Sequence, residues 1–117
     1  MINILSSSRY KINRHEIKTK AAALLSPSAS KVNYLMNIVF VGKNKMGFLS
    51  KKYKKESVVL PVLSFPYHIK NKKGENFIGE VVICYPQAIL LAAERQKKVD
   101  DIIWQLVQHG INNLLDN

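Results

Sequence analysis

The chain has 117 residues, 47% of them hydrophobic, which suits one domain (residues 1–117) with a modest core. Its longest apolar run is far shorter than a membrane span, and the amino terminus lacks the basic start and apolar block of a signal peptide. The lone Cys84 excludes an internal disulfide, so we expect a reducing, cytoplasmic setting.

The charge of the chain is strongly basic. Eighteen lysine and arginine residues against eight aspartate and glutamate residues give a net charge of +10. An acidic partner, first of all nucleic acid, is the natural expectation, and the alternative is that the lysines only keep a small protein soluble. The lysines are clustered in two segments, at Lys43, Lys45, Lys51, Lys52, Lys54 and Lys55 and at Lys70, Lys72 and Lys73.

Hydrophobic periodicity divides the chain into eight elements. In chain order we predict a strand at 2–5, a helix at 15–25, a strand at 34–41, a helix at 44–55, strands at 58–65 and 77–84, and helices at 86–98 and 99–117. This order predicts a single α/β domain of the α+β type, with a small four-stranded mixed sheet covered by helices.

Breakers and caps give the expected boundaries. Ser26-Pro27-Ser28 stops the first helix, and Asn44 and Asp100 are candidate caps of later helices. Pro61 indicates an edge strand or a bulge, and Pro66 is expected to close that strand. The polar segment 67–76 is then a loop, with His68 exposed, between two antiparallel strands.

The last helix carries the most informative histidine. Its core-facing arc comprises Val99, Ile102, Ile103, Leu106, Val107, Gly110 and Leu114. His109 lies at the edge of this arc, and Asn113 stands one turn later, where a second imidazole would complete an i, i+4 metal clamp. His109 is either a metal ligand or a partly buried histidine that is hydrogen-bonded at the edge of a helix.

Other polar residues fit ordinary roles better than catalytic ones. His15 has charged neighbours and no His or Cys partner, so we expect it on a solvated face. Ser64 lacks the glycines of a nucleophile elbow and suits a strand, and Cys84 suits the core. Glu80 is either a general base near the histidine or a strand-end carboxylate paired with a lysine.

Three sequence blocks together resemble the YbeY family of bacterial metal-dependent endoribonucleases. They are Val62-Leu63-Ser64-Phe65-Pro66, Ile78-Gly79-Glu80-Val81-Val82-Ile83-Cys84 and His109-Gly110-Ile111-Asn112-Asn113-Leu114. The segment 48–54 is similar to the family's Leu-Asn-x-x-Tyr-Arg block, with Lys54 at the arginine position. A lysine keeps the charge there but lacks the planar guanidinium group of arginine, which forms bidentate hydrogen bonds with phosphate.

The metal-binding block departs most from the family pattern His-Gly-x-Leu-His-Leu-x-Gly-Tyr-Asp-His, in which three imidazoles bind one metal ion, usually zinc. His109 matches the first ligand, Asn113 replaces the second, and the sequence ends at Asn117 before a third. The resemblance therefore implies zinc as the cofactor and His109 as a metal ligand. It also implies that one imidazole and an amide do not form the three-ligand site that activates water.

The resemblance implies a single-strand-specific endoribonuclease that processes ribosomal RNA, at the 3′ end of 16S rRNA, with the small ribosomal subunit as a partner. Lys54, with Lys51, Lys52 and Lys55, is then expected to bind RNA. The alternative is a non-catalytic RNA- or ribosome-binding relative, which the missing ligands favour. No catalytic residue and no oligomeric state follow from the sequence.

Overall fold

The structure is a computed structural model that describes residues 1–25 and 34–116. The elements follow the chain as β1 (Ile2–Leu5), α1 (Arg14–Leu25), β2 (Tyr34–Val41), α2 (Lys43–Lys54), β3 (Val62–Lys70), β4 (Asn76–Cys84), α3 (Tyr85–Arg95) and α4 (Val99–Leu115). All eight predicted elements are present in the predicted order. The predicted stop at Ser26-Pro27-Ser28 lies outside the described residues.

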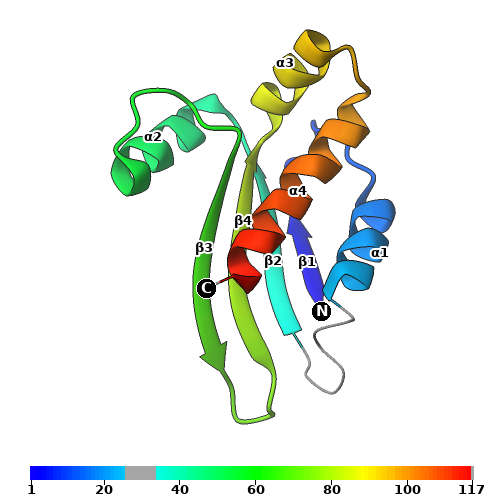
Figure 1. The fold of residues 1–117 in the computed structure, drawn as a ribbon, viewed down its shortest axis with the longest axis vertical. Helices are drawn as coiled ribbons and strands as arrows, with labels where there is room; N and C mark the ends of the chain where they lie inside the picture. Colours follow the sequence, from blue (N-terminus) through cyan, green and yellow to red (C-terminus); the bar gives the residue numbers. More distant parts are fainter. Residues whose placement is uncertain (26–33, 117) are drawn as a thin grey trace.

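The four strands form one mixed sheet in the order β1-β2-β4-β3 (Figure 1). β1, β2 and β4 run parallel, and β3 pairs with β4 in the antiparallel direction. The predicted α/β class, the four-stranded mixed sheet and the antiparallel pair are therefore confirmed. β3 is an edge strand, as Pro61 indicated.

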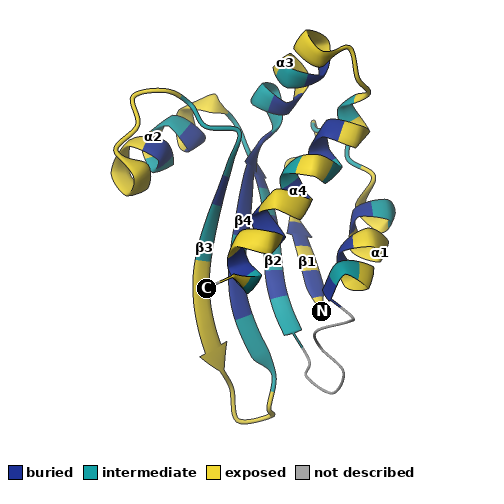
Figure 2. Ribbon diagram, viewed as in Figure 1, coloured by how far each residue is buried: buried dark blue, intermediate teal, exposed yellow. Residues whose placement is uncertain are grey.

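The main core lies between one face of the sheet and helices α1, α3 and α4. Met36, Ile38, Val81 and Ile83 from the strands pack against Ile103 and its neighbours on α4. The side of α4 turned away from the sheet is exposed, as the alternating colours along this helix show (Figure 2). The arc predicted for this helix is confirmed in outline, and Ile111, which is also fully buried, extends it.

The second face of the sheet is covered only at one end, by α2, among the described residues. Met46 of α2 packs there against Leu63, Val82 and Cys84. Cys84 is a buried core residue, as predicted, and burial raises the pKa of its thiol. The remainder of this face, toward β1 and the β3–β4 hairpin, includes exposed side chains such as Leu5 and Tyr67.

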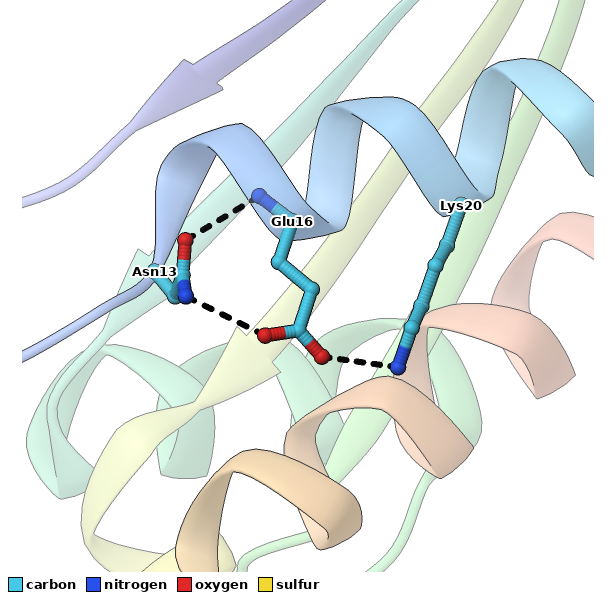
Figure 3. A network of polar contacts seen from close by, with 3 residues as sticks. All are labelled: Asn13, Glu16 and Lys20. Carbon is cyan, nitrogen blue, oxygen red and sulfur yellow. Dashed lines mark hydrogen bonds and ion pairs between the residues drawn. The ribbon is translucent and has the colours of Figure 1, made fainter.

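A polar network fixes the start of α1 (Figure 3). The Asn13 side-chain oxygen accepts a hydrogen bond from the Glu16 backbone N–H at 3.0 Å, and the Asn13 amide donates to the Glu16 carboxylate at 3.1 Å. Lys20 pairs with the same carboxylate at 2.7 Å. Because the Asn13 side chain satisfies a backbone N–H that the first turn leaves open, the helix begins at Arg14.

Two predicted caps are wrong. Asn44 lies within α2, and the cap position is Gly42, with no side-chain hydrogen bond. Asp100 lies in the first turn of α4, after the cap position Lys98. Both polar side chains still stand at a helix start, where the positive end of the helix dipole favours an acid such as Asp100.

The third strand is shifted along the chain relative to the prediction. β3 begins at Val62 and continues to Lys70, so Pro66 lies inside it and the predicted loop at 67–76 reduces to a turn after Lys70. Proline is tolerated because an edge strand needs only one row of ladder hydrogen bonds, and the register shifts between Pro66 and Ile69. His68, exposed as predicted, takes a positive φ of 50° at this irregularity.

Gly110 allows α4 to lie close to β4. A Cβ atom at this position would collide with the Val81 side chain, whereas a Cβ at Gly47 of α2 would meet Val59 at an ordinary 3.6 Å. We predict that Gly110→Ala lowers the free energy of unfolding by about 1–3 kcal/mol through overpacking. The matched change Gly47→Ala should raise it by about 0.5–1 kcal/mol through helix propensity. Urea denaturation of both variants checks this, and equal effects would contradict the close packing at Val81.

Candidate functional site

The carboxyl-terminal half of α4 is fixed directly on the edge strand β3. The Ser64 hydroxyl donates a hydrogen bond to the Gly110 carbonyl at 3.0 Å. Ser64 therefore lies in a strand, as predicted, and it links the strand block to the histidine block of the sequence. This contact places His109, the residue before Gly110, beside the outer edge of the sheet.

A pocket of about 550 Å³ opens between β3, α4 and the end of α2. We call it the β3–α4 pocket, and its lining includes Lys54, Ser64, Pro66, His109, Asn113 and Asp116. Three residues selected from the sequence, Lys54, His109 and Asn113, therefore meet in one place although they come from two distant segments. Sequence reasoning missed Asp116, which follows Asn113 by three residues and thus returns to the same side of the helix.

His109 is exposed on the surface of α4. The alternative interpretation, a partly buried histidine at the edge of the core, is therefore wrong. An exposed imidazole in an open pocket is accessible to a ligand or to a phosphate group. Its role as a metal ligand stays a prediction.

The donor atoms of the β3–α4 pocket do not match a three-imidazole zinc centre. The pocket offers the His109 imidazole, the Asn113 amide and the Asp116 carboxylate. Within residues 1–25 and 34–116, no three His, Cys, Asp or Glu side chains are grouped so that they could hold a metal ion. These residues alone therefore do not supply the three ligands that a catalytic zinc requires.

Four lysines form the α2 lysine cluster at the end of α2, defined as Lys51, Lys52, Lys54 and Lys55. All four are exposed, and only Lys54 among them lines the β3–α4 pocket. The negative end of the helix dipole favours this placement of positive charge. The cluster thus places positive charge at the end of α2, with Lys54 on the rim of the pocket, which suits a phosphate backbone.

Glu80 lies in a different place from the one considered for a general base. It faces the sheet surface opposite α4, where its carboxylate accepts a hydrogen bond from the Asn37 amide at 3.1 Å. The general-base interpretation near His109 is therefore wrong, and Glu80 hydrogen-bonds with the Asn37 amide and the Tyr67 phenol rather than pairing with a lysine. His15 is exposed, as predicted.

Comparison with known proteins identifies the family. The family model described as Endoribonuclease YbeY matches residues 3–116. The protein named Endoribonuclease YbeY from Thermodesulfovibrio yellowstonii is 35% identical over 85 aligned positions, and the alignment covers 69% of this chain and 51% of the relative. The protein of the same name from Phytoplasma australiense is 35% identical over 89 residues, 74% of this chain and 62% of the relative. The chain thus spans between half and two thirds of the length of these two relatives.

A longer match and a solved structure agree with this result. The Endoribonuclease YbeY of Dehalococcoides mccartyi is 30% identical over 129 aligned positions, covering 97% of this chain and 75% of the relative. The solution structure of TM1509 from Thermotoga maritima has the same fold, with a TM-score of 0.66 at 21% identity over 97% of this chain and 71% of that one. No helix in the described parts of the chain is long and apolar enough to cross a lipid bilayer. The family model, the relatives and the sequence blocks that meet at the β3–α4 pocket together show that the chain belongs to the YbeY family.

Proposed function

We propose that the chain acts in ribosomal RNA processing by holding single-stranded RNA in the β3–α4 pocket. The observation that carries this proposal is the meeting of Lys54, His109 and Asn113 in one open pocket, at the positions of the family's arginine and first two metal ligands. Lysine ammonium groups along a rim bind phosphates, and binding gains free energy from the release of counterions. The small ribosomal subunit, which contains such RNA, is the proposed partner.

The first form of this proposal is RNA cleavage, the activity in the name of the relatives. An exposed imidazole beside a bound phosphate can transfer a proton to or from a reacting oxygen, and Lys54 can balance the charge that develops on the phosphate. Zinc and a cytoplasmic location remain predictions. Because the described donors do not form a three-ligand centre, no step of the reaction is assigned to a metal here.

The second form is a non-catalytic RNA- or ribosome-binding protein, and Asn113 favours it. An amide oxygen is a weaker zinc donor than an imidazole, so a chain with asparagine at the second ligand position loses metal affinity without losing the fold. Asn113 is exposed, and the buried residues of α4 do not depend on its identity. RNA binding through the lysines is independent of this change.

One assay distinguishes the two forms. The purified chain is analysed for bound metal and mixed with an unstructured RNA oligonucleotide, with added zinc and with a chelator, and both binding and cleavage are followed. Cleavage that is lost in His109→Ala and retained in the control His15→Ala would support the enzyme. Binding without cleavage under every condition would support the non-catalytic form, and absence of RNA binding would contradict both.

A further inference from the structure

The sheet face opposite α4 carries a second pocket, of about 440 Å³, which the proposed function does not use. We call it the open-face pocket, and the residues relevant here are Lys45, Tyr53, Phe65, Tyr67 and Glu80. Successive residues of β3 point to opposite faces, so Ser64 and Pro66 line the β3–α4 pocket while Phe65 and Tyr67 line this one. Much of β3 beyond α2 is exposed, as Figure 2 shows.

Aromatic rings form one side of the open-face pocket. Tyr53 contacts Phe65 edge to face, with 5.1 Å between ring centroids, and Tyr67 stacks on Phe77 at 5.8 Å. Tyr53 is 53% exposed and Tyr67 is 48% exposed, so both rings are accessible to a ligand. Such rings on an open sheet are the platform on which unpaired bases stack in single-strand-binding proteins.

Hydrogen-bonding side chains cross the floor of this face from strand to strand. Asn3 of β1 donates to Asn37 of β2 at 3.3 Å, and Asn37 donates to Glu80 of β4 at 3.1 Å. Partial burial and the negative charge of Glu80 raise the pKa of the Tyr67 phenol, which also hydrogen-bonds with the Glu80 carboxylate. Asn37 thus orients the Glu80 carboxylate, which has further lone pairs available to accept hydrogen bonds.

The open-face pocket has a negative charge at Glu80, which suits a base, and a positive charge at Lys45 toward α2, which suits a phosphate. Glu80 on the floor repels phosphate, but it can accept hydrogen bonds from the N–H groups of a base. Lys45 lines the same pocket, and Lys52 lies 5.3 Å from the centre of the Tyr53 ring, so positive charge is available at the α2 side. A nucleotide with its base over the sheet and its phosphates toward α2 satisfies both signs of charge.

We propose that the open-face pocket binds one unpaired base of the same single-stranded RNA, stacked on Tyr67 or Tyr53, with its donor edge facing Glu80. Guanine fits best, because its N1–H and N2–H groups are adjacent and can donate to the two oxygens of one carboxylate. α2 contributes Lys54 to one pocket and Lys45 and Tyr53 to the other, so a strand that passes the edge of β3 along α2 contacts both. The inference rests on the proposed RNA function and adds a base preference to it.

Ring substitutions test the stacking. In fluorescence-anisotropy titrations with an unstructured RNA containing one guanine, replacing the ring that carries the base, by Tyr67→Leu or by Tyr53→Leu, should weaken binding about 5- to 100-fold, the range for loss of one stacked base. The matched control is Phe48→Leu, because Phe48 lies on the same basic helix and is 60% exposed but is absent from the pocket lining. Equal losses in all three variants, or no loss in the tyrosine variants, would overturn the proposal.

Base substitution tests the role of Glu80. Replacing the single guanine by inosine removes the N2 amino group, and we expect about tenfold weaker binding to the unmodified chain. In Glu80→Gln this difference should disappear, while the salt dependence set by the lysines stays unchanged. No preference for guanine in the unmodified chain would contradict the proposal, even if RNA binds.

Cross-linking separates failure of this inference from failure of the proposed function. Ultraviolet cross-links of bound RNA should map to Tyr67, Tyr53 or Phe65. RNA that binds and cross-links only at α4 would contradict the proposed base site in the open-face pocket, and it would still support RNA binding in the β3–α4 pocket. Absence of RNA binding would contradict both the base site and the proposed function. Self-association that buries Tyr67, detected by sedimentation, would assign this face to a second copy of the chain instead.

Discussion

Replacing the α2 lysine cluster by glutamine should lower the affinity of the chain for single-stranded RNA by roughly 100- to 1,000-fold at about 0.1 M salt. Each phosphate contact to a single strand contributes about −0.7 to the slope of log K against log salt, so four contacts contribute nearly −3. Removing these charges therefore both weakens binding and flattens its salt dependence. Titrations at several salt concentrations measure the two effects together.

The control for this result is a second quadruple variant with the same net charge as the first. Replacing Lys11, Lys18, Lys97 and Lys98 by glutamine removes four exposed lysines outside both pockets. If only the total charge of the chain matters, and not the position of the lysines, the two quadruple variants should show equal changes in affinity. If the α2 lysine cluster binds the RNA backbone, only the first variant should lose most of its salt dependence.

The second large effect is a gain of metal affinity. Asn113→His places two imidazoles one turn apart on α4, with Asp116 in the same pocket. Loss of a partner that only orients a ligand already costs 10- to 100-fold in metal affinity, so a restored ligand should increase zinc affinity by at least about tenfold. Isothermal titration with zinc measures this change, and circular dichroism checks that the exposed substitution leaves the fold intact.

A matched variant shows whether the gain comes from the pair. Combining Asn113→His with His109→Ala leaves a single imidazole, and zinc affinity should return to the value of the unmodified chain or below it. A gain that persists without His109 would place the zinc elsewhere. A gain of zinc affinity together with RNA cleavage would identify Asn113 as the substitution that limits catalysis.

Hydrophobic periodicity predicted the helices and strands well, because most of them bury one face against a continuous core. The apolar arc from Val99 to Leu114 predicts α4 without knowledge of its contacts, and the valines and isoleucines of β4 do the same for a central strand. The resemblance to YbeY rested on blocks that meet in space, since Ser64 of one block binds Gly110 of another. The helices, the strands and the family blocks depend on local sequence and can therefore be predicted from it.

The end of β3, the starts of two helices and the position of Glu80 depend on tertiary structure and could not be predicted from local sequence. Pro66 reads locally as a strand end, but an edge strand paired with β4 continues through it to Lys70. Asn44 and Asp100 read as caps, yet the backbone enters each helix one or two residues earlier. The side of the sheet on which Glu80 lies depends on the register of β4, which the bulge near Gly79 alters, and so its distance from His109 could not be predicted.

The candidate site was predictable in part for the same reason. His109 and Asn113 share a helix face by spacing alone, and Lys54 joined them only through the family's pattern. Asp116 follows Asn113 by three residues, so its place on the same side of α4 could have been predicted from spacing. The aromatic open-face pocket had no local signal, because its residues meet only after the sheet is assembled. Zinc and the ribosomal subunit stay predictions.

Nuclear magnetic resonance gives the most direct test of the central claim, that single-stranded RNA lies in the β3–α4 pocket. A ¹⁵N-labelled sample is titrated with an unstructured RNA oligonucleotide, and amide shifts are followed along the chain. We expect the largest changes at Lys54, Ser64, His109, Gly110 and Asn113, with α1 and α3 little affected. Changes confined to α1 or α3, or binding that leaves the amides of β3 and α4 unmoved, would contradict it.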